Sequence, residues 1–204
     1  IGMDALENNT GSYNTACGLR ALEASTTGTH NVAVGYNAAW KNTSASGNTA
    51  IGSEALATCT TGHSNTAIGN YALQDNNANH CVALGKSALT DNTTGTENIA
   101  VGNFSMFANT TGGGNTALGA NALTACTTGA SNVAIGKNAQ DTSTTGINNV
   151  SIGFDAGDTI TTGYNNIHIG HSCKGITDGQ ANAFIGANLN GGNQNNTLKL
   201  SQGN

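Results

Sequence analysis

The nonapeptide Asn65–Leu73, which reads NTAIGNYAL, is the unit that the rest of the chain repeats. A glycine follows the Asn-x-Ala-aliphatic half of each copy, and successive glycines are separated by 17 residues in eight intervals and by 16 in three. The twelve glycines are Gly2, Gly18, Gly35, Gly52, Gly69, Gly85, Gly102, Gly119, Gly136, Gly153, Gly170 and Gly186. A period this regular predicts a solenoid, in which each repeat forms one coil stacked on the next.

The composition is unusual for a folded chain of 204 residues. Charged residues make up 8% and aromatic residues 4%, and proline is absent. Without the repeat, such a composition would be typical of a disordered chain, but disorder does not require isoleucine, alanine and leucine to return at one phase. The formal net charge of -5 with six Lys and Arg provides no basic patch, so we expect no nucleic-acid partner. No apolar run approaches the ~20 residues of a membrane helix, so we expect no membrane insertion.

Each glycine ends a short segment that predicts a β-strand. Alternation of period two places the β-branched residues on one face and the alanine on the other. The Ala-Leu pair that follows, such as Ala72-Leu73, predicts a second short strand. The Thr-Thr-Gly segment, such as 60–62, predicts a turn on the outside of the coil.

The fold class is therefore all-β, and the architecture is a parallel β-solenoid, or β-roll, of about twelve coils of 16–17 residues. Stacking at ~4.7 Å per coil predicts a rod of roughly 55 Å. We place the repeat shaft in residues 1–186 and a terminal strand with an exit segment in 187–204, where 196–200 is expected to leave the solenoid register. The chain opens within a repeat, at Ile1-Gly2, so we expect it to be a segment of a longer protein.

Two sets of residues are predicted to hold the coils together. The aliphatic residues of the two strands are expected to fill the core: Ile51, Ile68, Leu73, Val101, Leu118, Ile135 and Ile152. The asparagine that opens each strand is expected to stack with its equivalents and to exchange amide hydrogen bonds along the axis. This ladder includes Asn31, Asn48, Asn65, Asn98, Asn115 and Asn132.

The apolar content of one coil predicts self-association. Each coil carries about six apolar residues, several of them alanine, and these are expected on one side. Other copies would supply the other side, with the alanine column allowing close approach. We expect a homotrimer, partly for this reason and partly from the family resemblance given below. The alternative is a monomeric coil with a very narrow core.

Towards the C-terminus the repeat changes. The alanine column continues as Ser151, His168 and Phe184. In a trimer, copies of His168 would converge on the axis, and with His171 and Cys173 nearby they are candidates for holding a metal ion or an anion. The alternative is a histidine in a hydrogen-bonded column.

The five cysteines form no intrachain disulfide framework. Cys59 and Cys126 share a phase of the repeat but lie four coils apart, beyond disulfide reach. Chain-to-chain disulfides at a turn remain an alternative. Cys17 replaces an aliphatic residue and is expected to be buried.

No catalytic or cofactor-binding constellation stands out. The eleven acidic residues scatter over the repeat, and the glycines lack the strand-to-helix context of a dinucleotide fingerprint. We therefore expect neither an enzyme nor a cofactor.

The unit Asn48-Thr49-Ala50-Ile51-Gly52, followed by Ala55-Leu56, resembles the head repeats of trimeric autotransporter adhesins of the YadA type. The longer unit with its Asn-Thr-Thr-Gly segment is similar to repeat shafts of phage tail fibres and large bacterial surface proteins. The resemblance covers residues 1 to about 186. It implies a left-handed parallel β-roll of three chains side by side, located outside the cell, on a virion tail fibre or a bacterial surface.

The expected function is a homotrimeric fibre or adhesin segment for attachment to a host or surface, with a host-surface glycan or receptor as a further partner. Two alternatives belong to other classes. One is an ice-binding solenoid with stacked Thr-Thr-Gly turns, and the other is a polysaccharide-cleaving tailspike, which would need paired carboxylates in a groove.

Overall fold

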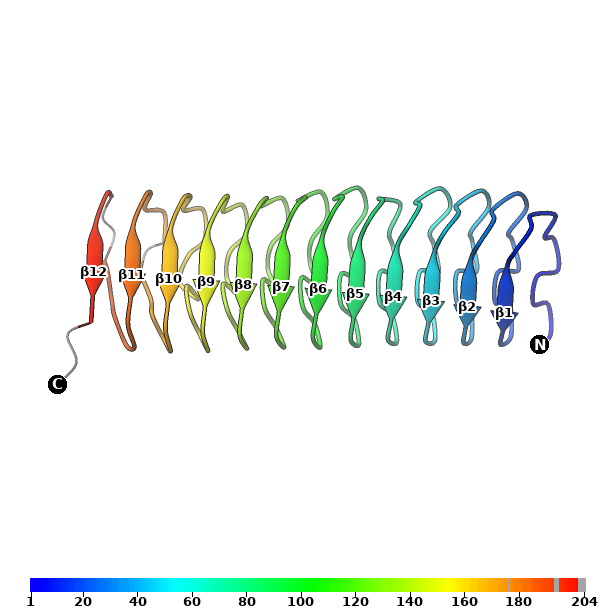
Figure 1. Cartoon of the computed structure of the whole chain (residues 1–204), viewed down its shortest axis with the longest axis horizontal. Coiled ribbons are helices and arrows are strands. Elements are labelled where there is room, and N and C mark those ends of the chain that lie inside the picture. The colour runs from blue at the N-terminus through cyan, green and yellow to red at the C-terminus, as the bar shows by residue number, and fades with distance from the viewer. Residues whose placement is uncertain (176, 193–194, 202–204) are drawn as a thin grey trace.

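The computed structural model of the protein describes residues 1–175, 177–192 and 195–201. Within these ranges it contains no helix, and its strands form one parallel sheet in chain order (Figure 1). Each strand has three residues and belongs to one coil. The strands are β1 (Thr15–Cys17), β2 (Val32–Val34), β3 (Thr49–Ile51), β4 (Thr66–Ile68), β5 (Val82–Leu84), β6 (Ile99–Val101), β7 (Thr116–Leu118), β8 (Val133–Ile135), β9 (Val150–Ile152), β10 (Ile167–Ile169), β11 (Ala183–Ile185) and β12 (Leu198–Leu200). The predicted all-β parallel solenoid is confirmed.

The register between strands is constant, so equivalent residues form straight columns along the rod. Ala50 of β3 pairs with Ala67 of β4, for example. The same register continues into the last strand, where Leu198 pairs with Ala183. The expectation that 196–200 leaves the register is therefore wrong, because β12 still obtains its backbone hydrogen bonds from β11. The division of the chain into 1–186 and 187–204 stays a prediction.

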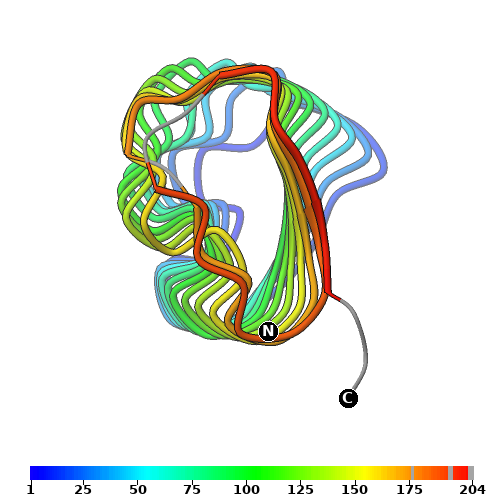
Figure 2. The same ribbon diagram turned by 90° about the vertical axis from the view of Figure 1, so that its left-hand side faces the viewer.

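The other wall of each coil consists of stacked turns, which Figure 2 shows opposite the strands. The second strand predicted at Ala72-Leu73 is wrong, because Tyr71 and Leu73 have left-handed backbones with φ of 60° and 50°. Such residues cost roughly 1–2 kcal/mol each. Hydrogen bonds between coils offset part of this cost, since the Tyr71 N–H donates to the Ser53 carbonyl (3.0 Å) and the Leu73 N–H to the Ala88 carbonyl (3.0 Å).

The interior is narrow, and the backbones of successive coils lie in contact at the glycine column. A Cβ added at Gly69, whose φ is 139°, would clash with the backbone carbonyl of Gly85. Inside the coil, the alanine of β4 packs with the leucine of the turn wall, so that Ala67 and Leu73 are both fully buried, and β1 to β8 all carry alanine at this position. Alanine therefore fits where a larger side chain would separate the two walls.

Near the C-terminal end the large and small side chains exchange walls. The strand column grows from Ala134 to Ser151, His168 and Phe184, all buried. On the facing wall Gly157 stands at the leucine position, and in the next two coils Gly175 and Gly191 lie one residue after it. A Cβ at Gly157, Gly175 or Gly191 would clash with Ser151, with His168 and with Phe184, respectively. The exchange keeps the interior filled without widening the coil.

Candidate interaction surface

The outward face of the sheet is largely apolar, with one column that is apolar in every strand and another in which threonines are interspersed with aliphatic residues. In each three-residue strand from β1 to β11 the middle residue is buried, whereas its two neighbours point outward and are partly or fully exposed. In β12 the middle residue, Lys199, is only partly buried. The outward residues form two columns, which we call the apolar stripe. The first column is Thr15, Val32, Thr49, Thr66, Val82, Ile99, Thr116, Val133, Val150, Ile167, Ala183 and Leu198, and the second is Cys17, Val34, Ile51, Ile68, Leu84, Val101, Leu118, Ile135, Ile152, Ile169, Ile185 and Leu200.

The apolar stripe corrects the predicted core. Leu73 is buried as expected, but Ile68 is 39% exposed and Ile152 36% exposed. Ile51, Val101, Leu118 and Ile135 lie in the same outward column and not in the core. The predicted alternation is right and the assignment of its faces is wrong, because only alanine fits where leucine fills the facing wall. The surface available to a partner is consequently the isoleucine column and not the alanine column.

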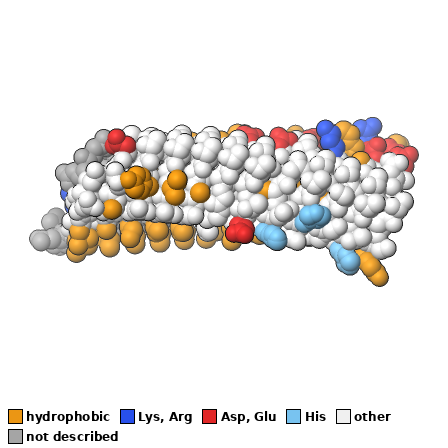
Figure 3. Space-filling view, turned by 90° about the horizontal axis from the view of Figure 1, so that it is seen from above, with side chains coloured by type: hydrophobic (Ala, Val, Ile, Leu, Met, Phe, Trp, Pro, Cys, Tyr) orange, Lys and Arg blue, Asp and Glu red, His pale blue; other side chains and the backbone are white. Residues whose placement is uncertain are grey.

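Part of the stripe is visible in Figure 3 as a row of hydrophobic side chains along the lower edge of the left-hand, C-terminal part of the rod. Neighbouring side chains within each column cover one another's sides, since strands repeat at ~4.7 Å. Their outer ends remain exposed. Contiguous apolar patches that extend along a whole molecule are uncommon on monomeric proteins and mark interaction surfaces.

The asparagine ladder that precedes the strands connects successive coils and so keeps the columns of the apolar stripe aligned. Asn115 is fully buried, and its Oδ1 accepts from the backbone N–H of Asn132 (2.9 Å) while its Nδ2 donates to the Gly129 carbonyl (2.8 Å). The predicted column is present, but most of its bonds connect a side chain to the backbone of the next coil. Direct amide-to-amide bonds occur in the C-terminal half, for example from Asn149 to Asn132 (3.2 Å).

One ladder position carries a cysteine. Cys81 stands where other coils have asparagine, and its thiol donates to the Gly95 carbonyl (3.2 Å) as the amide does elsewhere. Its backbone N–H still donates to Oδ1 of Asn65 (2.9 Å). Burial raises the pKa of this thiol, so it stays protonated and keeps its donor role.

A second interior ladder was missed by the sequence analysis, which placed this half of the repeat outside. Its members lie seven residues after each glycine and are small or amide side chains. Asn92 donates to Oδ1 of Asn76 (2.6 Å), and Asn109 donates to Oδ1 of Asn92 (2.7 Å). Burial also raises the pKa of the Cys59 thiol, which occupies this column, to about 11. The signal in the sequence was a phase restricted to Asn, Ser and Cys over nine coils, from Asn9 to Ser143.

The threonine corner is part of the coil-to-coil bonding. The Thr93 hydroxyl donates to the Thr110 carbonyl (2.9 Å), and the Thr110 hydroxyl donates to the Thr127 carbonyl (3.0 Å). The second threonine of the corner, such as Thr94, is exposed. The hydroxyl of the first threonine is therefore engaged in holding the stack.

The three metal-ligand candidates do not meet. His168 is fully buried inside the coil, whereas His171 is exposed and stacks on the Phe154 ring (5.4 Å between centroids). The Cys173 thiol is buried and donates to the Phe184 carbonyl (3.3 Å). Within the described ranges no group of three His, Cys, Asp or Glu side chains could hold a metal ion. The proposed convergence of His168 on a trimer axis is wrong as well, because its ring faces the interior of its own coil.

The cysteines correct two further expectations. Cys59, Cys81, Cys126 and Cys173 are buried. The turn cysteines Cys59 and Cys126 are thus inaccessible to chain-to-chain disulfides in the folded coil. Cys17 is exposed in the apolar stripe, against the expectation that it is buried.

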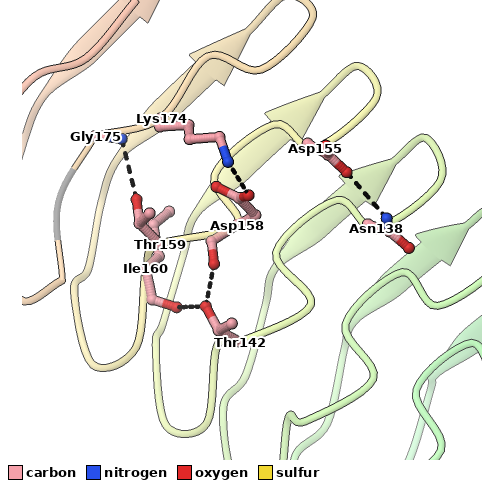
Figure 4. Close-up of polar contacts among 8 residues, drawn as sticks. All are labelled: Asn138, Thr142, Asp155, Asp158, Thr159, Ile160, Lys174 and Gly175. Atoms are coloured by element: carbon pink, nitrogen blue, oxygen red, sulfur yellow. Dashed lines mark hydrogen bonds and ion pairs between the residues drawn. The ribbon is translucent and has the colours of Figure 1, made fainter.

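An acidic cluster on the turn wall was also missed. Asp141 and Asp158 share one phase, five residues after their glycines, and the pKa of Asp141 is raised by burial, then by Asp158 and Asp155. Figure 4 shows the contacts of Asp155 and Asp158. Lys174 pairs with Asp158 (2.5 Å), and Asn138 donates to Asp155 (3.0 Å). The described surface has no pocket around these or other residues.

No family model, curated protein or solved structure matches this chain. The described residues contain no helix with the length and hydropathy needed to cross a bilayer.

Proposed function

We propose that this chain is a structural and adhesive fibre segment that associates through its apolar stripe as a homotrimer, and that it acts outside the cell, in a virion tail fibre or on a bacterial surface. The single observation that carries the proposal is the stripe itself, two columns wide and present in every strand from β1 to β12. Burying such a surface is the main favourable term in protein association.

The internal organisation supports the same role. Each coil hydrogen-bonds only to its neighbours through backbone, asparagine and threonine bonds, so the rod extends by adding coils. A ring of three chains is favoured over a pair because each of the two columns then contacts a different neighbour. The segment spaces or presents a binding tip, and it has no catalytic role.

The test is the mass of the assembly in solution. Ile68→Glu places an unpaired carboxylate in the stripe, and burying that charge costs several kcal/mol. We expect three times the mass of one chain for the unaltered protein by light scattering, and dissociation of the Ile68→Glu variant.

The matched control is Ile147→Glu, because Ile147 is 45% exposed but lies outside the strands. This control should keep the trimer mass. A stable monomer of the unaltered protein would remove the proposal, and dissociation of both variants alike would show that the stripe is not the interface.

The attachment role is located on the polar turns, which remain exposed when the stripe is covered. Binding of the assembled rod to an array of host-surface glycans tests it. Absence of binding to every glycan would reduce the segment to a spacer.

A further inference from the structure

The apolar core is interrupted near the C-terminal end of the rod. A long cluster of buried apolar residues ends at Ala139, and a short separate one contains Cys173 and Phe184. Between them the strand column holds Ser151 and His168, and Gln140 on the facing wall donates to the Ser151 Oγ (2.9 Å). We call Gln140, Ser151 and His168 the polar seam.

His168 is buried in the neutral form. It has no exposed surface, and neither ring nitrogen has a hydrogen-bond partner. Its ring meets the edge of the Phe184 ring (5.3 Å between centroids), and its Nε2 lies against Gly175. Burial lowers the pKa of the imidazole from its usual 6.5 to about 4. A charged imidazolium there would lack both water and a partner.

The groups that face His168 provide no counter-ion. β9 contributes Ser151 and β11 contributes Phe184. The turn after β10 contributes Cys173, whose pKa is raised by burial. Beyond Phe184 the next residue of the column is Lys199, which lies over that ring (5.7 Å) and adds positive charge. None of the described Asp and Glu residues is buried.

Two carboxylates lie on the outer wall nearby. Asp158 pairs with Lys174, both of them part-exposed. The pKa of Asp141 is raised in the folded coil, so its protonation in acid favours the folded state and does not open it.

We propose that the three coils of β10, β11 and β12 open from the rod in mild acid, at the polar seam, while the coils of β1 to β8 stay folded. Protonation of His168 is compatible with the open coils and not with the closed ones. Each coil contacts only its neighbours, so the C-terminal end can open without the remainder. The seam is the place of separation because the two apolar clusters do not meet across it.

The direction of the pH dependence follows from the depressed pKa. Well above pH 6.5, His168 is neutral in both the open and the closed coils, and its contribution to closure is then complete. The contribution declines as pH falls below 6.5 and is lost near pH 4. At pH 4.5 the opening equilibrium of these coils should be roughly 70-fold larger than at pH 7.5.

The experiment is peptide-resolved hydrogen exchange of the whole chain at pH 7.5 and 4.5, normalised to the unfolded chain at each pH. Peptides from β10 to β12 should lose protection at pH 4.5, and those from β1 to β8 should keep it. The emission of Trp40, the single tryptophan, reports the N-terminal half and should not change. Equal protection of the C-terminal peptides at both pH values, or a change of Trp40 emission in parallel with their exchange, would overturn the proposal.

Variants assign the effect to His168. His168→Leu should keep the C-terminal peptides protected at pH 4.5, and His168→Ser provides a second variant if leucine prevents folding at pH 7.5. His171→Gln, an exposed histidine three residues away, should behave as the unaltered chain. Acid opening that persists in both His168 variants, or that disappears in Asp158→Asn, would overturn the assignment.

Discussion

At the scale of single residues, this coil buries its smallest strand residue and exposes its larger ones. Ala67 lies inside and Ile68 outside, although the transfer free energy of isoleucine is the larger of the two. The interior is instead completed by Leu73 from the facing wall. The asparagine side chains of the ladder connect the coils, because each one hydrogen-bonds to backbone groups of the next coil.

The asparagine ladder leads to a prediction about Asn115. Asn115→Ala removes the acceptor of the Asn132 N–H and the donor to the Gly129 carbonyl, both in the buried ladder. Each buried group left without a partner costs about 1–3 kcal/mol. We therefore expect a loss of roughly 2–4 kcal/mol in the free energy of unfolding, measured by urea denaturation monitored by circular dichroism.

Asn103→Ala is the control, since Asn103 is exposed on the turn wall. Its effect should remain within about 0.5 kcal/mol, as for other surface substitutions. A loss for Asn115→Ala no larger than that of Asn103→Ala would show that the ladder contributes little to stability.

At the scale of elements, the corner before each strand depends on a left-handed residue. Glu97 has φ of 60° there, and the equivalent Gly114 has φ of 68°. A Cβ at Gly114 would meet only ordinary van der Waals contacts, at 3.6 Å and more from Ser131. This position therefore separates backbone strain from crowding.

Gly114→Ala should destabilise the chain by about 1 kcal/mol through the left-handed backbone alone. Gly114→Asn should cost less, because asparagine tolerates this conformation and Asn148 and Asn165 adopt it in the same column. The urea midpoints of the two variants make the comparison. Equal losses for alanine and asparagine would contradict the account of this corner.

At the scale of the whole molecule, the rod is a sum of similar coils with a modified C-terminal end. Deleting residues 99–115, one full coil of 17 residues, would bring 98 and 116 together at equivalent phases of the repeat. The shortened chain should fold with the same circular dichroism spectrum and form a rod shorter by ~4.7 Å. Small-angle scattering measures that length.

Deleting 99–106 is the contrasting variant, because eight residues disrupt every column at once. It should unfold or aggregate. A full-coil deletion that fails to fold, or an eight-residue deletion that folds as well as the original, would contradict the picture of interchangeable coils.

The sequence by itself determined the period, the position of every strand from β1 to β11 and the asparagine ladder, because a residue type that returns at one phase must form a column in a stack. The residues of the acidic cluster and of the second ladder also recur at fixed positions of the sequence repeat, but their pattern was not among our predictions. Only the tertiary structure decided which face of the strand is interior. Period-two alternation is symmetric with respect to the two faces, and the choice depends on the distance between the walls of the coil. Left-handed turns bring Leu73 and its equivalents inward so closely that only alanine fits opposite them, and isoleucine is left outside as a surface for a partner.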